Sequence, residues 1–330
     1  MAGLRIRYCK KFCRHSVSVA LVQELPAYVQ WADIIHLTAV YSFPTFPTLA
    51  AARIFNKPVV WSPRGALQRW NGSSKLALKR IWESASYRIA GRRLLTLHLT
   101  SAEEAQQSLL RFPQLRAVVI PNGVDIPSSR KREANRGYLR MLYIGRLHPI
   151  KGIEALLHAC DRVGKDSPGF CLRIAGAGTP DYVATLKTMV DDLGLHDRIE
   201  FRGDVRGEKK EVLFDDTDVV IVPSHVENFA MVVAESLARG VPVIASKGTP
   251  WRDLETHGCG LWVENQPDSL GAAICRMREM PLADMGERGR RWMQEHYSWD
   301  RVSAQMFQLY RECIESQMNK HDQWRSRVVQ

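Results

Sequence analysis

The sequence predicts an α/β protein made of two parallel-sheet domains, and three observations carry this prediction. Short apolar runs alternate with helical patterns along the chain, which is typical of parallel α/β architecture. The chain has 330 residues, enough for two domains of ordinary size. A polar, charged stretch at 128–135 interrupts the alternation as a linker would. We therefore expect a first domain over 1–130, a second over 131–316 and a polar tail over 317–330.

Apolar runs rich in Val, Ile and Leu predict the strands of the first domain. A helix is expected first, over about 15–31, and another over about 76–89, where apolar residues recur with helical spacing. The predicted strands cover residues 33–37, 58–61, 94–99 and 117–120.

A second series of strands follows the linker. These strands cover residues 140–144, 171–175, 199–201, 218–222 and 241–245. A last helix is expected over about 299–316, where it could cross back to the first domain, and the polar tail after it is predicted to be disordered.

Composition excludes several classes of protein. The seven cysteines are odd in number and form no C-x-x-C, which argues against a disulfide scaffold or a zinc site and fits a reducing cytosol. No run approaches the roughly 18–20 apolar residues of a membrane span. The apolar run at 17–22 is also too short for a signal peptide. We expect a cytoplasmic protein.

Charge is distributed unevenly between the two halves. Residues 1–137 carry 21 basic and 7 acidic residues, a net charge of +14, whereas the rest carries 25 and 28, a net charge of −3. A basic first domain suits anionic lipid headgroups on the inner face of the plasma membrane, although ordinary surface charge is the equal alternative. Nucleic acid is disfavoured, because the basic residues are not interleaved with aromatics and no recognition motif occurs.

The loop after the strand at 140–144 has residues suited to a diphosphate. Gly145 allows close backbone approach, Arg146 offers a planar fork and Lys151 a point charge. Taken alone, such a loop is more often simply a solvated surface loop. Glycine turns at Gly176 and Gly203 follow the next two strands. They lack the complete G-x-G-x-x-G spacing and are weak signals.

The segment 224–235 is more informative, because it places two carboxylates, Glu227 and Glu235, around a predicted helix start after the strand at 218–222. Asn228 is predicted as the N-cap of a helix over 229–238. A helix amino terminus at the carboxyl end of a strand is a natural phosphate site. Alternatively, Glu227 could only stabilise the helix dipole, and Glu235 could be a surface carboxylate.

Five segments in order resemble the retaining glycosyltransferases of family 4, which have the GT-B fold. They are 119–125, 145–152, 175–178, 201–203 and the E-x7-E pair Glu227/Glu235. The stretches 247–251 and 255–260 resemble the branch that builds lipopolysaccharide and exopolysaccharide. The resemblance covers roughly residues 115–300. It implies two Rossmann-like doubly wound domains facing a cleft.

The resemblance also implies roles for these residues. Arg146 and Lys151 would hold the donor diphosphate in place of a metal, and Glu227 would contact the donor sugar. Glu235 would bind the ribose. The base of the nucleotide would lie near the turn from Gly203 to Val205. The loop and turn residues that would surround the bound nucleotide sugar are Gly145, Gly176, Gly203, Asp204, Val205, Asn228, Phe229, Ala230 and Met231. The donor would be a UDP- or GDP-linked sugar and the acceptor a glycan, lipid-linked in this branch. No resident cofactor is implied.

The first domain departs from the family pattern. Members begin with a strand and a glycine-rich loop, and here the chain starts at a later helix. Either the start codon is misassigned or the domain is truncated at its amino terminus, and we expect a truncated first domain. Family members often have a His after the strand matching 58–61, where this chain has Ser62-Pro63-Arg64-Gly65. Arg64 and His36 lie at strand ends and are candidate catalytic residues. A turn-capping role for Arg64 and a structural role for His36 are the alternatives.

Two competing functions remain open from the sequence. A nucleotide-sugar epimerase would need a separate set of acid and base residues facing the sugar, and the sequence shows none. An inactive nucleotide-sugar-binding or scaffold protein is favoured by the missing amino-terminal segment. The predicted function is transfer of a sugar to an acceptor hydroxyl, with retention of configuration.

Overall fold

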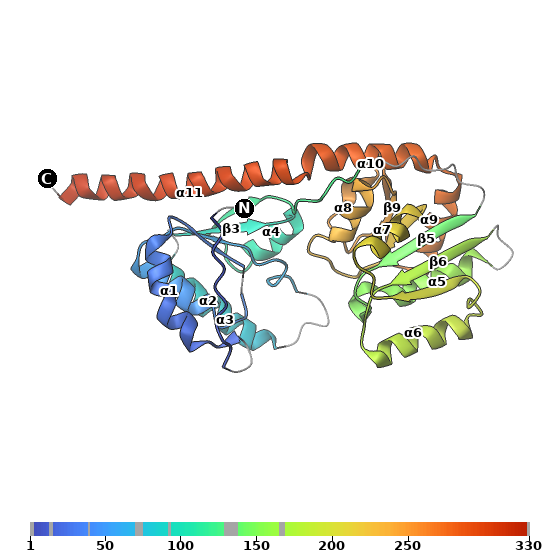
Figure 1. Ribbon diagram of the computed structural model, residues 1–330, viewed down its shortest axis with the longest axis horizontal. Helices are drawn as coiled ribbons and strands as arrows, with labels where there is room; N and C mark the ends of the chain where they lie inside the picture. The colour runs from blue at the N-terminus through green and yellow to red at the C-terminus, as the bar shows by residue number, and fades with distance from the viewer. Residues whose placement is uncertain are drawn as a thin grey trace. The chain divides into compact units, whose positions relative to one another are not determined.

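The computed structural model describes residues 3–12, 16–38, 40–69, 75–91, 94–128, 138–164 and 169–328, and side chains as far as residue 318. It divides into two compact units (Figure 1). Unit 1 comprises Met1–Pro121 and Ser303–Gln330, and unit 2 comprises Asn122–Val302. The first unit thus ends at residue 121, whereas we expected the first domain to end at residue 130. Residues 303–316, which we expected in the second domain, belong to unit 1. Residues 129–135 of the predicted linker lie outside the described residues.

Unit 1 is built on a four-stranded parallel sheet in the order β1-β2-β3-β4. Its strands are β1 (Ile35–Leu37), β2 (Val59–Trp61), β3 (Leu95–Leu99) and β4 (Arg116–Val119). Its helices before the boundary are α1 (Val19–Trp31), α2 (Thr45–Ile54), α3 (Leu76–Ala90) and α4 (Ala102–Leu109). α1 begins later than predicted, because Ser18 caps it by accepting the Leu21 N–H at 3.3 Å.

The two faces of this sheet differ in chemistry. One face is apolar, with Leu37, Trp61 and Leu97 packed against α2 and α3. The other carries His36, Ser62 and His98, and the last helix, α11 (Trp299–Val328), lies against it through Tyr310 and Cys313 (Figure 1). Side chains alternate along a strand, so neighbouring residues of one strand serve opposite faces.

Unit 2 contains a six-stranded parallel sheet in the order β10-β9-β8-β5-β6-β7. Its strands are β5 (Leu139–Ile144), β6 (Phe170–Ala175), β7 (Ile199–Gly203), β8 (Val219–Val222), β9 (Val243–Ser246) and β10 (Gly260–Val263). Its helices are η2 (Pro149–Lys151), α5 (Ile153–Val163), α6 (Pro180–Asp192), α7 (Glu208–Asp215), α8 (Met231–Ala238), η3 (Arg252–Leu254), α9 (Pro267–Glu279) and α10 (Leu282–His296).

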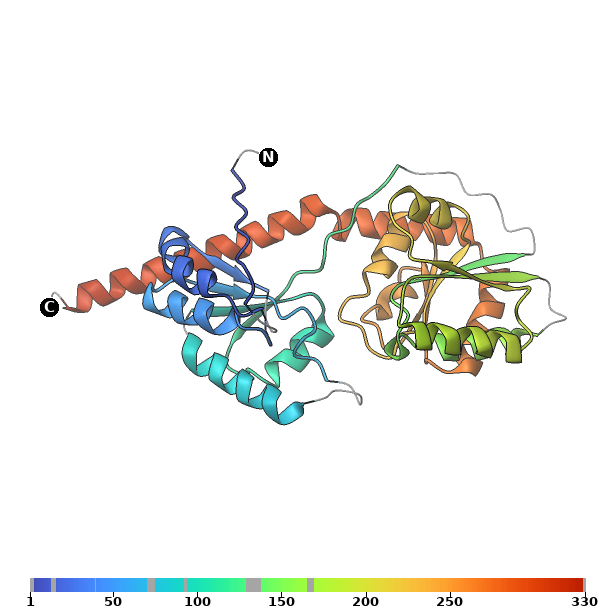
Figure 2. The same cartoon turned by 60° about the horizontal axis from the view of Figure 1, so that its bottom comes forward.

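Helices cover both faces of the second sheet (Figure 2). α5, α6 and α9 pack on one face, around buried residues such as Met141 and Ile221. α7, α8 and α10 pack on the other, around Leu142 and Val220. Burial on both faces explains why these strands read as continuous apolar runs.

All nine strands predicted from the sequence occur, with bounds shifted by no more than two residues. The prediction omits β10, whose four residues follow a glycine-rich turn. The predicted disordered tail is wrong as far as residue 328, because α11 continues through it. Between residues 299 and 328 the sequence has neither Gly nor Pro, the two residues that end helices most effectively. No helix among the described residues is both long and apolar enough to cross a membrane.

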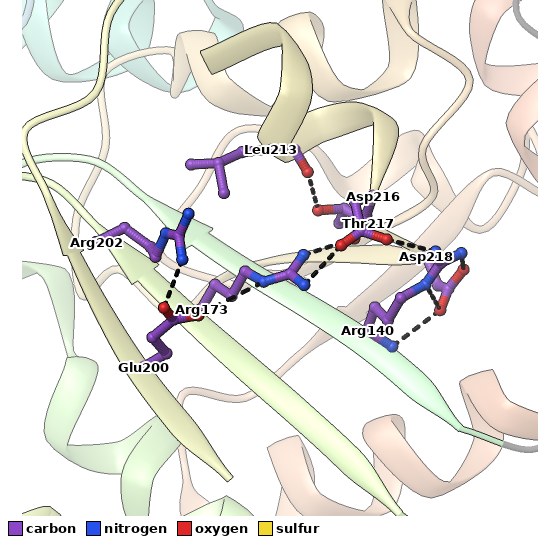
Figure 3. A network of polar contacts seen from close by, with 8 residues as sticks. All are labelled: Arg140, Arg173, Glu200, Arg202, Leu213, Asp216, Thr217 and Asp218. Carbon is purple, nitrogen blue, oxygen red and sulfur yellow. Dashed lines mark hydrogen bonds and ion pairs between the residues drawn. The ribbon is translucent and has the colours of Figure 1, made fainter. Parts of the chain in front are cut away.

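A charged network lies across the second sheet (Figure 3). Arg140 of β5 pairs with Asp218 at 2.7 Å and with Asp216 at 2.6 Å. Arg173 of β6 pairs with the same Asp216 at 2.6 Å. These contacts join β5 and β6 to the segment between α7 and β8. The charges of these strand residues are therefore neutralised within the sheet.

Candidate functional site

The carboxyl ends of β5 and β8 mark the candidate site in unit 2. Numbered within this unit, the strand order is 3-2-1-4-5-6, the order of nucleotide-binding doubly wound domains. The order reverses between β5 and β8, so the loops that follow them diverge and leave a crevice. Arg146 and Lys151 follow β5, and Glu227 follows β8.

Lys151 and Glu227, separated by 76 residues in the sequence, form an ion pair in this crevice. Ser224 Oγ also donates to Glu227 Oε1 at 2.8 Å, and the Glu227 N–H donates to the Gly248 carbonyl at 2.8 Å. The side chains of Lys151 and Glu227 are 19% and 15% exposed. The structure therefore brings together two residues that the sequence assigns to diphosphate and sugar.

Close backbone packing fixes the position of Lys151. The His225 N–H donates to the Ile150 carbonyl at 2.8 Å, which docks η2 on the segment after β8. Gly152 has a φ of 63°, and a Cβ there would lie 2.2 Å from the Pro223 carbonyl oxygen. Only glycine fits such an approach. Lys151 is thus presented to Glu227 by a rigid backbone.

The glycine turns after β5, β6 and β7 lie side by side. The Gly145 N–H donates to Ala175 O at 2.9 Å, and the Gly176 N–H donates to Gly203 O at 2.7 Å. A Cβ on Gly176 would lie 1.8 Å from Gly145 O, so no other residue fits there. Close packing between strands accounts for this glycine without any ligand.

The residues after Gly203 and the Arg146 side chain border this row of turns. Asp204 pairs with Arg206 at 2.9 Å, and Val205 packs partly buried against the α7 and α8 core. The side chain of Arg146 is exposed. The backbone carbonyl of Arg146 accepts a hydrogen bond from the Tyr143 hydroxyl at 2.9 Å. Burial first, and then the charge of Glu227, raise the pKa of Tyr143. The sequence prediction missed Tyr143, because a tyrosine in a strand is an ordinary core residue.

The start of α8 differs from the prediction. The helix begins at Met231, with Ala230 in the cap position, and Asn228 is not its N-cap. Ala230 has φ 59° and ψ 70°, a left-handed conformation that delays the helix. The buried Phe229 precedes it, and its carbonyl accepts the Trp251 indole N–H. The Asn228 Oδ1 atom is buried and has no hydrogen-bond partner among the described residues.

Glu235, on the second turn of α8, has a partner that the sequence did not reveal. Its Oε2 atom lies 2.8 Å from Nζ of Lys210 on α7. The side chains of Glu235 and Lys210 are 25% and 26% exposed. The pair explains how a carboxylate is tolerated on an otherwise apolar helix. The predicted contact of Glu235 with a ribose stays a prediction.

In unit 1, His36 belongs to a chain of hydrogen bonds across three strands. His98 Nε2 lies 3.0 Å from the Ile120 carbonyl, and Ser62 Oγ lies 2.7 Å from His98 Nδ1 and 2.6 Å from His36 Nε2. His36 Nδ1 contacts the Tyr310 hydroxyl.

The direction of this chain follows from its last acceptor. The Ile120 carbonyl can only accept, so His98 Nε2 donates to it and His98 Nδ1 accepts from the Ser62 hydroxyl. His36 Nε2 then donates to Ser62, and His36 Nδ1 accepts from Tyr310. Both rings are held neutral, because burial lowers the pKa of His98 and lowers that of His36 to about 4. A catalytic role for His36 stays a prediction.

Arg64 lies close to both histidines, and its charge contributes to their lowered pKa values. The residue follows β2, and its side chain is exposed. The structure therefore brings together the two candidate residues of unit 1, at the carboxyl ends of neighbouring strands.

The strand order and site loops place unit 2 in the class of nucleotide-binding doubly wound domains. Comparison with known proteins specifies the family. The profile of the family Glycosyl transferases group 1 matches residues 125–292, so the chain belongs to this family.

The chain also resembles individual members. It is 29% identical over 236 residues to an uncharacterized glycosyltransferase of Methanocaldococcus jannaschii, covering 65% of this chain and 59% of that protein. It is 27% identical over 274 residues to the MMP alpha-(1->4)-mannosyltransferase of Mycolicibacterium hassiacum, covering 81% and 62%. The chain thus spans about three fifths of the length of these relatives.

Solved structures share the fold of both units. The Anabaena protein Alr3699/HepE, solved in complex with UDP, aligns with a TM-score of 0.75 at 19% identity, covering 89% of this chain and 82% of that one. The predicted fold class is confirmed: two Rossmann-like parallel-sheet domains with glycosyltransferases among the structural neighbours.

Proposed function

We propose that the protein transfers a sugar from a UDP- or GDP-linked donor to an acceptor hydroxyl, with retention of configuration. The observation that carries the proposal is the Lys151–Glu227 pair at the reversal point of the second sheet. A cation suits the donor diphosphate and a carboxylate suits the sugar hydroxyls, and here they are adjacent. Membership of the glycosyltransferase family supports this use of the two residues.

Binding of the donor uses the remaining site residues. Arg146 joins Lys151 in balancing the charge that develops on the leaving diphosphate, an electrostatic role that needs no metal. The backbone N–H groups of Phe229, Ala230 and Met231, at the start of α8, face the phosphate or the sugar. Glu235 accepts the ribose hydroxyls, and the turn Gly203–Val205 lies near the base.

The chemical step that we propose is front-face attack. The acceptor hydroxyl approaches the anomeric carbon from the side of the departing diphosphate, whose oxygen takes the acceptor proton. Attack and departure on one face keep the anomeric configuration. Arg64 and His36 serve the acceptor side, and Glu227 holds the donor sugar during transfer.

The acceptor that we propose is a lipid-linked glycan of the lipopolysaccharide or exopolysaccharide type, met at the inner face of the plasma membrane. The resemblance of residues 247–251 and 255–260 to that branch supports this acceptor. Unit 1 also combines basic residues with exposed aromatics, such as Tyr8 at 87% and Trp31 at 79%. Such residues favour an anionic interface.

The test is a panel of nucleotide sugars, scored by calorimetric binding and by hydrolysis. One donor should bind at least about tenfold more tightly than the rest, because a lost hydrogen bond to a charged group such as Glu227 costs about 1.5–3 kcal/mol. With acceptor extracts, the anomeric configuration of the product is read by NMR. Glu227→Gln should weaken the nucleotide sugar more than the free nucleoside diphosphate. Tight binding without turnover would instead identify a scaffold.

A further inference from the structure

The loop after β9, residues 247–251, lies directly against the segment that carries Glu227. The Glu227 N–H donates to the Gly248 carbonyl at 2.8 Å, and Ser246 Oγ donates to the Ser224 carbonyl. A Cβ on Gly248 would lie 2.3 Å from the carbonyl oxygen of Ser224, so no other residue fits there. The backbones of the two loops are therefore in fixed contact.

Other bonds in unit 2 fix the loop after β9 itself. The Lys247 N–H donates to the Val263 carbonyl at 2.7 Å, which continues the pairing of β9 with β10. The Trp262 indole N–H donates to the Thr249 carbonyl at 3.1 Å, and the Thr249 hydroxyl donates to the Ser246 carbonyl at 2.8 Å. The loop is thus a rigid support for the groups that bond to it.

Trp251, at the end of this loop, holds the backbone just before α8. The residue is 2% exposed, and its indole N–H donates to the Phe229 carbonyl. The Phe229 ring packs against the indole edge-on, with ring centroids 5.2 Å apart. An indole N–H buried without an acceptor is costly, so this bond is kept as long as Trp251 stays in the core. The Phe229 carbonyl is therefore fixed in direction.

The same bond sets the direction of the next N–H group. Phe229 C=O and Ala230 N–H belong to one planar trans peptide and point in opposite directions. Because the carbonyl points toward Trp251, the Ala230 N–H points away from that indole. This N–H donates to no backbone carbonyl among the residues that the structure describes. It is thus free to bond to a ligand.

The conformation of Ala230 depends on the same support. Its φ of 59° is left-handed, and the right-handed helix α8 begins at the next residue, Met231. Such a strained backbone persists only where its surroundings impose it. Trp251 holds the peptide before Ala230, and the Val233 N–H holds the Ala230 carbonyl at 2.9 Å. Where left- and right-handed residues adjoin, successive N–H groups converge on a concavity that suits an anion.

We propose that Trp251 is a positioning residue for the donor, because its indole turns the Ala230 N–H toward the diphosphate of the nucleotide sugar. The inference rests on the proposed function, which brings the N–H groups at the start of α8 against the donor. Trp251 is buried and does not touch the donor. It acts only through the Phe229–Ala230 peptide. Residues 247–251 thus support the donor site.

The first experiment observes the Ala230 N–H directly. Phe229-Ala230 is the only Phe-Ala step in the 330 residues. Full-length protein labelled with ¹³C-carbonyl phenylalanine and ¹⁵N-alanine therefore gives a single signal in a carbonyl-correlated NMR spectrum. Saturation with UDP or GDP, whichever binds, should shift the proton of this signal downfield, as a new bond to phosphate does. This measurement needs only the unaltered protein, so it stands even if a variant fails to fold.

The second experiment removes the indole N–H and keeps an aromatic ring. By calorimetry, Trp251→Phe should weaken the diphosphate by at least about fivefold, because a hydrogen bond to a charged group is lost or misdirected. Trp292→Phe is the matched control. Trp292 packs against Trp251 with centroids 5.6 Å apart, and in the described part of the chain it has no hydrogen bond to residues 224–231. That variant should stay within about twofold of the unaltered protein.

A rescue variant separates positioning from general damage to the core. Glycine adopts the left-handed conformation without strain. Trp251→Phe/Ala230→Gly should therefore bind the diphosphate at least about twofold more tightly than Trp251→Phe, with all variants titrated below their melting temperatures. A loss caused only by poorer packing would not be recovered in this way.

The outcomes distinguish this inference from the function on which it rests. Diphosphate binding without a shift of the Ala230 signal overturns the inference and leaves the proposed transfer standing. Equal affinities of Trp251→Phe and Trp292→Phe have the same meaning. Failure of UDP, GDP and every nucleotide sugar to bind the unaltered protein would instead overturn the proposed transfer, and the positioning role with it.

Discussion

Lys210 of α7 places its ammonium group 2.8 Å from the carboxylate of Glu235 on α8. Glu235 is the residue that we expect to hold the ribose of the donor. Because both side chains retain about a quarter of their exposure, water screens the pair, and its contribution to stability is at most about 1 kcal/mol. The contact therefore orients the carboxylate rather than stabilising the fold.

The two members of this pair should affect nucleotide binding unequally. Glu235→Gln removes a charged acceptor for the ribose and should weaken a nucleoside diphosphate by about tenfold, since hydrogen bonds to charged groups contribute about 1.5–3 kcal/mol. Lys210→Met leaves the carboxylate in place and should change the affinity by less than about threefold. Isothermal titration calorimetry measures both.

The control for this prediction is a second ion pair between α7 and α8. Arg239 binds Glu211 of α7 through two contacts, at 2.9 and 2.7 Å. Glu211→Gln should leave nucleotide affinity unchanged. Equal losses in Glu211→Gln and Glu235→Gln would show that packing of α7, and not ribose binding, determines the affinity.

Lys151 should contribute to both stability and binding. Lys151→Met leaves Glu227 mostly buried without its cation, which should lower the free energy of unfolding by about 1–3 kcal/mol. The double variant Lys151→Met/Glu227→Gln should recover part of this loss, because no uncompensated charge remains. Urea unfolding measures stability, and neither variant should recover diphosphate binding. A double variant no more stable than Lys151→Met alone would contradict this account.

Strand positions could be predicted from the sequence because burial on both faces produces continuous apolar runs, as in β5 and β8. The Lys151–Glu227 contact could not be predicted from spacing, because 76 residues separate its members and only the strand order brings them together. The roles of these two residues were predicted from the family resemblance, and the contact between them was found only in the structure.

Local signals failed where tertiary packing decides the backbone. Asn228 is a good N-cap by residue type, yet α8 starts later because Ala230 is left-handed and Phe229 is held by Trp251. Glu104 has the spacing of a capping box, but its carboxylate bonds to a loop that follows a different strand. Neither partner can be identified without the fold.

The strain at Ala230 can be relieved by substitution. Ala230→Gly removes a Cβ that costs roughly 1–2 kcal/mol in the left-handed region, offset in part by greater freedom of the unfolded chain. We expect a net gain of about 0.5–1 kcal/mol, seen as a rise of a few degrees in the melting temperature.

Ala184, exposed in the middle of α6, provides the control. There Ala184→Gly should lower stability by about 0.5–1 kcal/mol, because the backbone is right-handed and glycine is a poor helix former. Destabilisation by both substitutions would mean that the left-handed start of α8 is not strained.

The stability of unit 1 should depend on pH through His36. Burial, then the charges of His98 and Arg64, lower its pKa from 6.5 to about 4. As pH falls from 6.5 to 4, the unfolded chain therefore binds a proton that the folded chain does not, so the free energy of unfolding falls across this window and levels below it. His98, with its pKa also lowered, acts in the same direction. Hydrogen exchange of the β1–β3 amides, corrected for intrinsic rates, measures how the free energy of unfolding changes with pH.

The variant His36→Gln tests the contribution of this ring. It should make the pH dependence shallower, because it removes one of the two titrating rings. An unchanged pH dependence would show that His36 is already protonated or fully solvated in the folded protein.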